Sequence, residues 1–279
     1  MADGQKLDLN AAAARAGLKT PRPVPLFEPT AAQDAEIERL IKKIVAAWNV
    51  ALREEILPAY RDGIKRRAGS PLALGITSGE LFEIEQALNR ATEATVRADA
   101  ALEPQIAQFV VGFTAWHTAR FVSGVQSASG VNLLPVLTTE DASDIMQAAI
   151  RRNVSLIKGL NEDMRRKVET AVLTAWNENS SAKRLTKILR SELGFAPSRA
   201  RLIGRDQISK LAGELDKMRS ESLGLKAYVW VTRQDDRVRP RHQVQHGKTY
   251  LWSKPTPAGF PGSEINCRCR ARPIIEPKT

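Results

Sequence analysis

The residues of this sequence best suited to metal or acid–base chemistry lie near its C-terminal end. His242 and His246 are separated by three residues, and Cys267 and Cys269 by one. Neutral imidazoles and thiolates at four positions are the ligand types of a tetrahedral zinc site. The cysteine spacing is not that of a standard zinc finger, so a second interpretation stays open. In that interpretation the two cysteines flank Arg268 on a strand and their thiols are simply packed.

Acidic residues nearby could take part in the same chemistry. Asp235 or Asp236 could replace one histidine as a ligand. A hydrolytic zinc site would also need an open ligand position and a general base, and Glu264 is the only nearby candidate. The sequence contains no phosphate-binding glycine loop, no GxSxG elbow and no paired-carboxylate motif. We therefore expect a protein that is not an enzyme and requires no cofactor, with zinc as the one candidate metal.

The elements that would position these residues differ from the rest of the chain. Residues 228–232 (YVWVT) are aromatic and β-branched, which is typical of a strand, and residues 250–252 predict a second short strand. Prolines and glycines between residues 255 and 262 then exclude regular helix. Before residue 228 the apolar residues recur at helical spacing. The fold class we expect is α+β and predominantly α-helical, with a long helical N-terminal body and a small, loop-rich C-terminal domain that contains the strands.

Three segments are expected along the chain. Residues 1–30 contain four prolines within nine positions and little apolar periodicity, which predicts a flexible tail. Residues 31–180 form the helical body, and residues 181–279 form the C-terminal domain.

Within the helical body, single residues suggest where helices begin and end. Thr30 is a suitable N-cap, and Pro58 predicts a kink or a restart. Pro104 and Asn161 are each expected to open a new helix. His117 lies among apolar residues with no second ligand nearby, so we interpret it as a packed or hydrogen-bonded histidine.

Positive charge is concentrated in the last third of the chain. Residues 183–279 hold 21 Lys and Arg against 9 Asp and Glu, whereas residues 1–182 hold 21 against 22. This asymmetry favours a polyanionic partner, although a solvated basic surface is the alternative. The candidate nucleic-acid-binding residues are Arg199, Arg201, Arg205, Lys210, Arg237, Arg239, Arg241, Arg268 and Arg270. The first four would lie on the second helix of a helix–glycine–helix segment at 181–218, which could also be a helix-turn-helix that reads a DNA sequence.

No run of about twenty apolar residues is present, so no membrane span is expected. The N-terminal residues lack the pattern of a secretory signal, and two cysteines one residue apart do not form a disulfide framework. These features favour a reducing intracellular origin.

The C-terminal third also carries an ordered series of matches to a known family. These are the helix ARLIGRDQISKLAGELDKMRSESLG (200–224), Tyr228-x-Trp230-x-Thr232, and DRVRxxH ending at His242. Gly247, Pro255, the GxPG turn at 259–262 and NCRC at 266–269 follow. From about residue 181 to residue 273, the sequence resembles the phage Mu F-like head morphogenesis family, the minor capsid proteins of tailed bacteriophages.

The resemblance implies a virion protein, located in the capsid interior or at the portal vertex and in the host cytoplasm during assembly. It implies partners in the portal protein and in the major capsid or scaffolding protein, with non-specific contact to double-stranded DNA. Phe260 stands where the family is expected to have a polar residue, often histidine, and His246 where none is called for. If the family motif binds a metal, the implied ligands are therefore His242, Cys267, Cys269 and Asp236. The alternative functions are a zinc-dependent nuclease or other hydrolase acting on nucleic acid, and a helix-turn-helix DNA-binding regulator.

Overall fold

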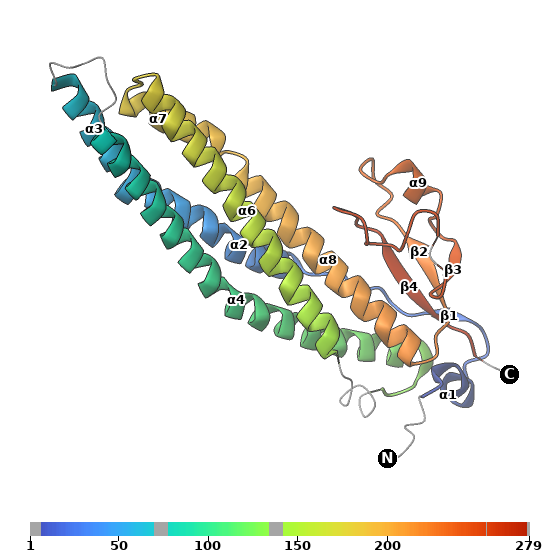
Figure 1. Cartoon of the computed structure of the whole chain (residues 1–279). Coiled ribbons are helices and arrows are strands. Elements are labelled where there is room, and N and C mark those ends of the chain that lie inside the picture. The colour runs from blue at the N-terminus through green and yellow to red at the C-terminus, as the bar shows by residue number, and fades with distance from the viewer. Residues whose placement is uncertain (1–6, 70–77, 134–141, 255, 278–279) are drawn as a thin grey trace. The chain divides into compact units, whose positions relative to one another are not determined.

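The computed structural model describes residues 7–69, 78–133, 142–254 and 256–277. Most of these residues are helical, and the C-terminal third contributes three strands to a small antiparallel sheet, which confirms the expected fold class (Figure 1). The elements in chain order are α1 (Leu9–Arg15), β1 (Arg22–Pro23), α2 (Ala31–Ala51), the π-helical turn η1 (Leu52–Ile56), α3 (Leu57–Gly69), α4 (Ser78–Ser129), α6 (Ser143–Asn177), α7 (Ala182–Glu192), α8 (Ala196–Ser222), β2 (Ala227–Val231), α9 (Pro240–Gln243), β3 (Thr249–Leu251) and β4 (Arg270–Ile275).

The chain forms two compact units, each built from separate stretches of sequence. The first comprises residues 1–34, 107–150 and 205–279, and the second comprises residues 35–106 and 151–204. Helices α2, α4, α6 and α8 each contribute residues to both. The expected segment boundaries at residues 30 and 180 do not coincide with these units.

Local sequence explains how the first long helices begin and bend. The Thr30 amide donates to Gln33 Oε1 at 2.8 Å, and the Gln33 amide donates to Thr30 Oγ1 at 3.2 Å. This reciprocal capping box fixes the start of α2, as expected for Thr30. At Pro58, which has no backbone donor, the helix does not restart. The π-helical turn Leu52–Ile56 precedes the proline and lets the helix continue into α3.

Two helix starts expected from the sequence are wrong. Helix α4 passes through Pro104 without ending, because Leu102 and Ile106 on either side are both buried and hold the segment against its unit. Helix α6 likewise passes through Asn161. The Asn161 side chain accepts from Trp48 Nε1 at 2.5 Å and donates to Asp99 Oδ2 at 2.6 Å. It is therefore an interhelical bridge and not a cap.

The sheet has the strand order β1-β4-β2-β3, and all its pairs are antiparallel. Tyr228 on β2 lies opposite Tyr250 on β3 and Pro273 on β4. The predicted strands at 228–232 and 250–252 are thus present, shifted by one residue at their ends. The strand that pairs with β2 on its other side begins at Arg270, so the cysteines precede it and do not lie within it.

Residues 7–30 are part of the first unit rather than a tail. Leu9 on α1 is fully buried and packs with Val24, Phe121 and Ile275. Asn10 donates to Gly224 O at 3.2 Å and accepts from the Glu276 amide at 2.8 Å. The prolines that suggested a tail allow the extended segment in which β1 pairs with β4.

Among the described residues, no helix is long and apolar enough to cross a membrane.

Candidate functional site

His242, Cys267 and Cys269 come together beside β2. His242 Nδ1 lies 3.4 Å from Cys267 Sγ and 3.6 Å from Cys269 Sγ. The three ligand atoms all lie within 4.8 Å of one another. The residues are only 1%, 4% and 2% exposed, and the His242 ring meets the indole of Trp230 edge-on at 5.4 Å. The structure brings together three of the five residues that the sequence suggested as metal ligands.

Asp236 and His246, the other two predicted ligands, lie outside this cluster. Among the described residues, the group that could hold a metal contains neither of them. His246 Nδ1 is 3.0 Å from the Thr232 amide, which fastens the loop after α9 to the end of β2. Asp236 is exposed, and its neighbour Asp235 pairs with Arg268 at 2.6 Å.

The two thiols influence each other's ionisation. The neighbouring Cys269 thiol lowers the pKa of Cys267 to about 5, and the backbone amides of Cys269 and Gly262 act in the same direction against the effect of burial. The pKa of Cys269 is raised, first by Cys267 and then by burial. The pair therefore loses its first proton easily and keeps the second, which the two sulfurs share.

A second polar cluster, which the sequence analysis did not identify, is buried in the first unit. His117 Nε2 on α4 lies 3.0 Å from Asp216 Oδ1 on α8, and Arg270 Nη2 on β4 lies 2.6 Å from Asp216 Oδ2. Arg219 donates to His117 Nδ1 and, at 2.7 Å, to Thr118 Oγ1. We call His117, Asp216, Arg219 and Arg270 the buried charge cluster. His117 is packed and hydrogen-bonded, as expected from the sequence.

The buried charge cluster holds two groups in defined ionisation states. Burial is the largest influence on His117, and it lowers the pKa of the imidazole. Burial also opposes ionisation of Asp216, but Arg270 and then His117 outweigh it and keep the pKa of that carboxyl below its ordinary value. In the folded state the buried charge cluster therefore contains a neutral His117, an ionised Asp216 and two arginines.

Replacing His117 with glutamine should weaken the dependence of stability on mild acid. Unfolded His117 binds a proton below about pH 6.5, whereas folded His117 resists protonation, so the free energy of unfolding falls as the pH drops below that value. The slope from one such proton is at most about 1.4 kcal/mol per pH unit. Urea denaturation of both proteins between about pH 5 and pH 8 measures it. Parallel curves for both proteins below about pH 6.5 would contradict the assignment.

An arginine-lined pocket of about 310 Å³ lies in the first unit. We call it the arginine pocket. Its lining residues are Glu28, Pro29, Asp34, Arg205, Ser209, Arg233, Arg237, Arg268 and Arg270. Arg233 pairs with Glu28, and Arg268 and Arg270 are paired as described above. Arg205 and Arg237 are exposed and form no ion pair with any described residue, so their charge is available to an anion.

The remaining predicted nucleic-acid-binding residues do not line the arginine pocket, and each is ion-paired. Arg239 and Arg241 lie within 3.4 Å and 2.7 Å of Glu264, and Lys210 lies 2.7 Å from Asp206. Arg201 lies 3.3 Å from Glu38. Arg270 needs correction as a DNA contact, because it is only 5% exposed and directed at Asp216.

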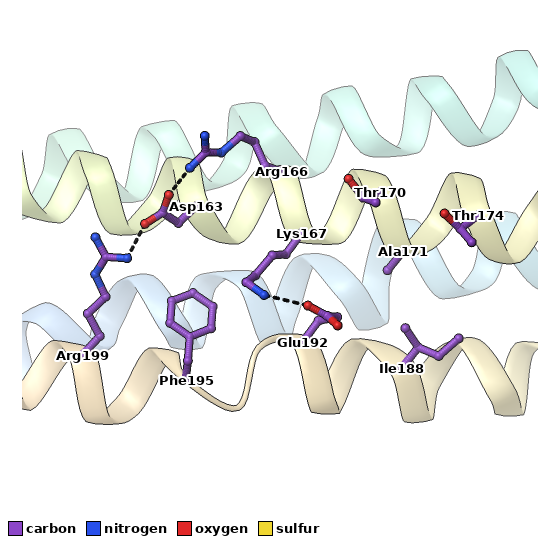
Figure 2. A pocket seen from close by; sticks show the side chains of 10 residues that line it. All are labelled: Asp163, Arg166, Lys167, Thr170, Ala171, Thr174, Ile188, Glu192, Phe195 and Arg199. Carbon is purple, nitrogen blue, oxygen red and sulfur yellow. Dashed lines mark hydrogen bonds and ion pairs between the residues drawn. The ribbon is translucent and has the colours of Figure 1, made fainter.

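Arg199 lies at a different pocket, in the second unit. This groove of about 610 Å³ is lined by residues of α6, α7 and the start of α8. Figure 2 shows Asp163 between the guanidinium groups of Arg166 and Arg199, and Lys167 paired with Glu192 at 2.7 Å. The positive charge at this groove is therefore matched by acidic side chains.

Sequence reasoning missed Arg233, Arg219 and Asp216. Arg233 directly follows the predicted strand and precedes the acidic turn at Asp235 and Asp236, so its position was a usable signal. Arg219 and Asp216 stand in an apparently exposed stretch of polar helix, and nothing in the local pattern shows that they are buried.

Comparison with known proteins bears on residues 166–272. This segment matches the family described as "Phage Mu protein F like protein". It contains α7, α8, β2, α9 and β3, together with all three residues of the histidine–cysteine cluster. Residues 166–272 are therefore similar to the phage Mu F-like family.

An uncharacterized protein of Haemophilus influenzae is 29% identical over 170 residues, which cover 60% of this chain. The chain spans only 38% of the length of that relative. No solved structure matches the chain.

The part of the phage Mu F-like segment that lies in the first unit, residues 205–272, does not form that unit alone. Strand β1 pairs with β4, and Leu9 of α1 fills the core formed by Leu223, Leu225 and Ile275. Residues that precede the matched segment by more than a hundred positions therefore complete its sheet and its core.

Proposed function

We propose that this protein is a minor capsid protein that acts in the assembly of a tailed phage head and associates with the portal vertex. The observation that carries the proposal is the family match at residues 166–272, which falls on the sheet and the histidine–cysteine cluster. Further partners under this proposal are the major capsid or scaffolding protein. The site of action is the virion, in the capsid interior or at the portal.

Contact with packaged DNA is part of the proposal. Phosphate recognition without sequence preference needs accessible positive charge rather than base-reading geometry. Arg205 and Arg237 supply such charge at the arginine pocket.

The two alternative functions have less support. A hydrolytic metal centre must admit its substrate, and His242, Cys267 and Cys269 are at most 4% exposed. A helix-turn-helix reader must present the first residues of its second helix to base edges. In α8 those residues include Arg199 and Arg201, which are paired with Asp163 and Glu38. A structural, non-enzymatic role is the function we propose.

Capture on the portal protein of the same phage tests the proposal. The full chain is the appropriate bait, because residues 183–279 alone would lack α1, β1 and the α4 residues of their own core. We expect the tagged chain to retain portal rings at physiological salt, and the protein to be present in purified virions by mass spectrometry. The portal protein of an unrelated phage is the control. A chain that is absent from virions and does not retain its own portal would overturn the assembly role.

A further inference from the structure

The three side chains of the histidine–cysteine cluster direct their ligand atoms at one another. Both thiols face the same imidazole nitrogen, with Cys267 Sγ at 3.4 Å and Cys269 Sγ at 3.6 Å from His242 Nδ1. That nitrogen has one lone pair, so it can accept a hydrogen bond from only one thiol. A single ion placed among the three atoms would satisfy all of them.

The two nitrogen–sulfur distances are those expected of zinc ligands. With Zn–S near 2.3 Å and Zn–N near 2.0–2.1 Å, tetrahedral angles place a ligating nitrogen about 3.6 Å from each ligating sulfur. The two observed distances are 3.4 Å and 3.6 Å. The residues come from two different loops, yet they already lie at the separation of zinc ligands.

A carboxylate stands behind the histidine, on the side away from the sulfurs. Glu264 Oε2 lies 3.4 Å from His242 Nε2, and Arg241 holds Glu264 Oε1 at 2.7 Å. A carboxylate at the far ring nitrogen keeps the proton there and leaves Nδ1 free to bind a metal. Histidines that ligate metals commonly have such a partner.

Both sides of the cluster are anchored by the fold. His242 stands on the single turn α9, whose His242 amide donates to Arg239 O at 2.8 Å. The cysteine loop is fastened to α8, because the Asn266 amide donates to Asp206 Oδ1 at 2.8 Å and Ser209 Oγ donates to Cys267 O at 3.3 Å. An ion at the cluster would therefore cross-link the α9 loop to the cysteine loop.

We propose that His242 Nδ1 and the thiolates of Cys267 and Cys269 bind one zinc ion that stabilises the fold. Softness of the ligands selects zinc over magnesium or calcium, which prefer oxygen. Three protein ligands with a water is the ligand count of a catalytic site. All three residues are buried, however, and the loops around them have only a small apolar core. We therefore assign the ion a structural role and not a catalytic one. The inference does not depend on the proposed role in the phage head.

Metal analysis of the full chain tests the site. Protein expressed in zinc-supplemented medium and desalted should contain about one zinc per chain, and Co²⁺ exchanged into it should show thiolate-to-cobalt charge-transfer absorption. The doubly substituted Cys267→Ser/Cys269→Ser protein should show neither signal. His246→Gln is the matched control and should keep both, because His246 lies outside the cluster.

We expect Glu264 to position the His242 ring, so replacing Glu264 gives a second test of the zinc site. Glu264→Gln should weaken zinc binding about 10–100-fold in competition with a chelating dye, without abolishing it. A chelator should lower the Tm of the unsubstituted protein by about 5 °C or more.

The unsubstituted chain is informative even if the cysteine variant fails to fold. Substoichiometric zinc together with no charge-transfer absorption would overturn the site. Full zinc content in a folded Cys267→Ser/Cys269→Ser protein would overturn it as well.

Discussion

Replacing Asp216 with asparagine should lower the free energy of unfolding by about 3–5 kcal/mol. Asp216 is 5% exposed and accepts from Arg270 Nη2 at 2.6 Å, while its other oxygen lies 3.0 Å from His117 Nε2. Removing the negative charge leaves Arg270 buried with an uncompensated positive charge, with Arg219 close by in the same cluster. Removing one partner of a buried ion pair lowers the stability of the fold by far more than the intact pair raises it, because the other charge stays buried without a counter-charge. Urea denaturation followed by circular dichroism measures the change.

The same chemical change at the surface is the control for this variant. Asp62→Asn removes a carboxylate that is 66% exposed and lies 3.9 Å from Lys65, so a decrease below about 0.5 kcal/mol is expected. Replacing both buried partners, as Asp216→Leu with Arg270→Met, should cost less than Asp216→Asn alone, because the arginine that Asp216 pairs with is removed together with it. Equal decreases for Asp216→Asn and Asp62→Asn would show that the buried charge cluster does not stabilise the fold.

Elements with a strong local signal could be predicted from the sequence. The β-branched and aromatic residues of β2 and the reciprocal cap at Thr30 are properties of neighbouring residues, and the structure contains both. Gly224 follows the end of α8 with a φ of 74°, a conformation that favours glycine. The histidine–cysteine cluster could also be predicted, since few other residues of these types occur in the chain.

Features that depend on distant partners could not be predicted. Pro104 stays inside α4 because tertiary packing of Leu102 and Ile106 outweighs a local helix-breaking preference. Asn10 is an ordinary polar residue in sequence, and only its bonds to Gly224 and Glu276, more than two hundred positions away, make α1 part of the core. Asp216 and Arg270 are separated by 54 positions, so their pairing appears only in the folded chain.

The arginine pocket leads to the second large expected effect, on binding to double-stranded DNA. Removal of one phosphate-binding arginine should reduce the slope of log K against log salt by about 0.9, and removal of two therefore by about 1.8. Arg205→Ala with Arg237→Ala should accordingly weaken binding to any DNA sequence roughly 60-fold at about 0.1 M salt. Both side chains are exposed and without an ion pair to a described residue, so the fold should be unaffected. Fluorescence anisotropy with duplexes of unrelated sequence, at several salt concentrations, measures the affinity and the slope.

A double substitution elsewhere separates site-specific phosphate binding from net charge. Arg53→Ala with Arg61→Ala removes the same two charges from exposed positions on η1 and α3, and neither arginine is ion-paired to a described residue. A phosphate-binding pocket predicts a much larger reduction of the slope for the Arg205 and Arg237 pair than for this control. If both double variants bind DNA equally weakly, DNA attraction is a property of the overall charge. If both bind as tightly as the unsubstituted chain, the arginine pocket does not contact DNA, and the basic C-terminal third then needs an acidic partner other than nucleic acid.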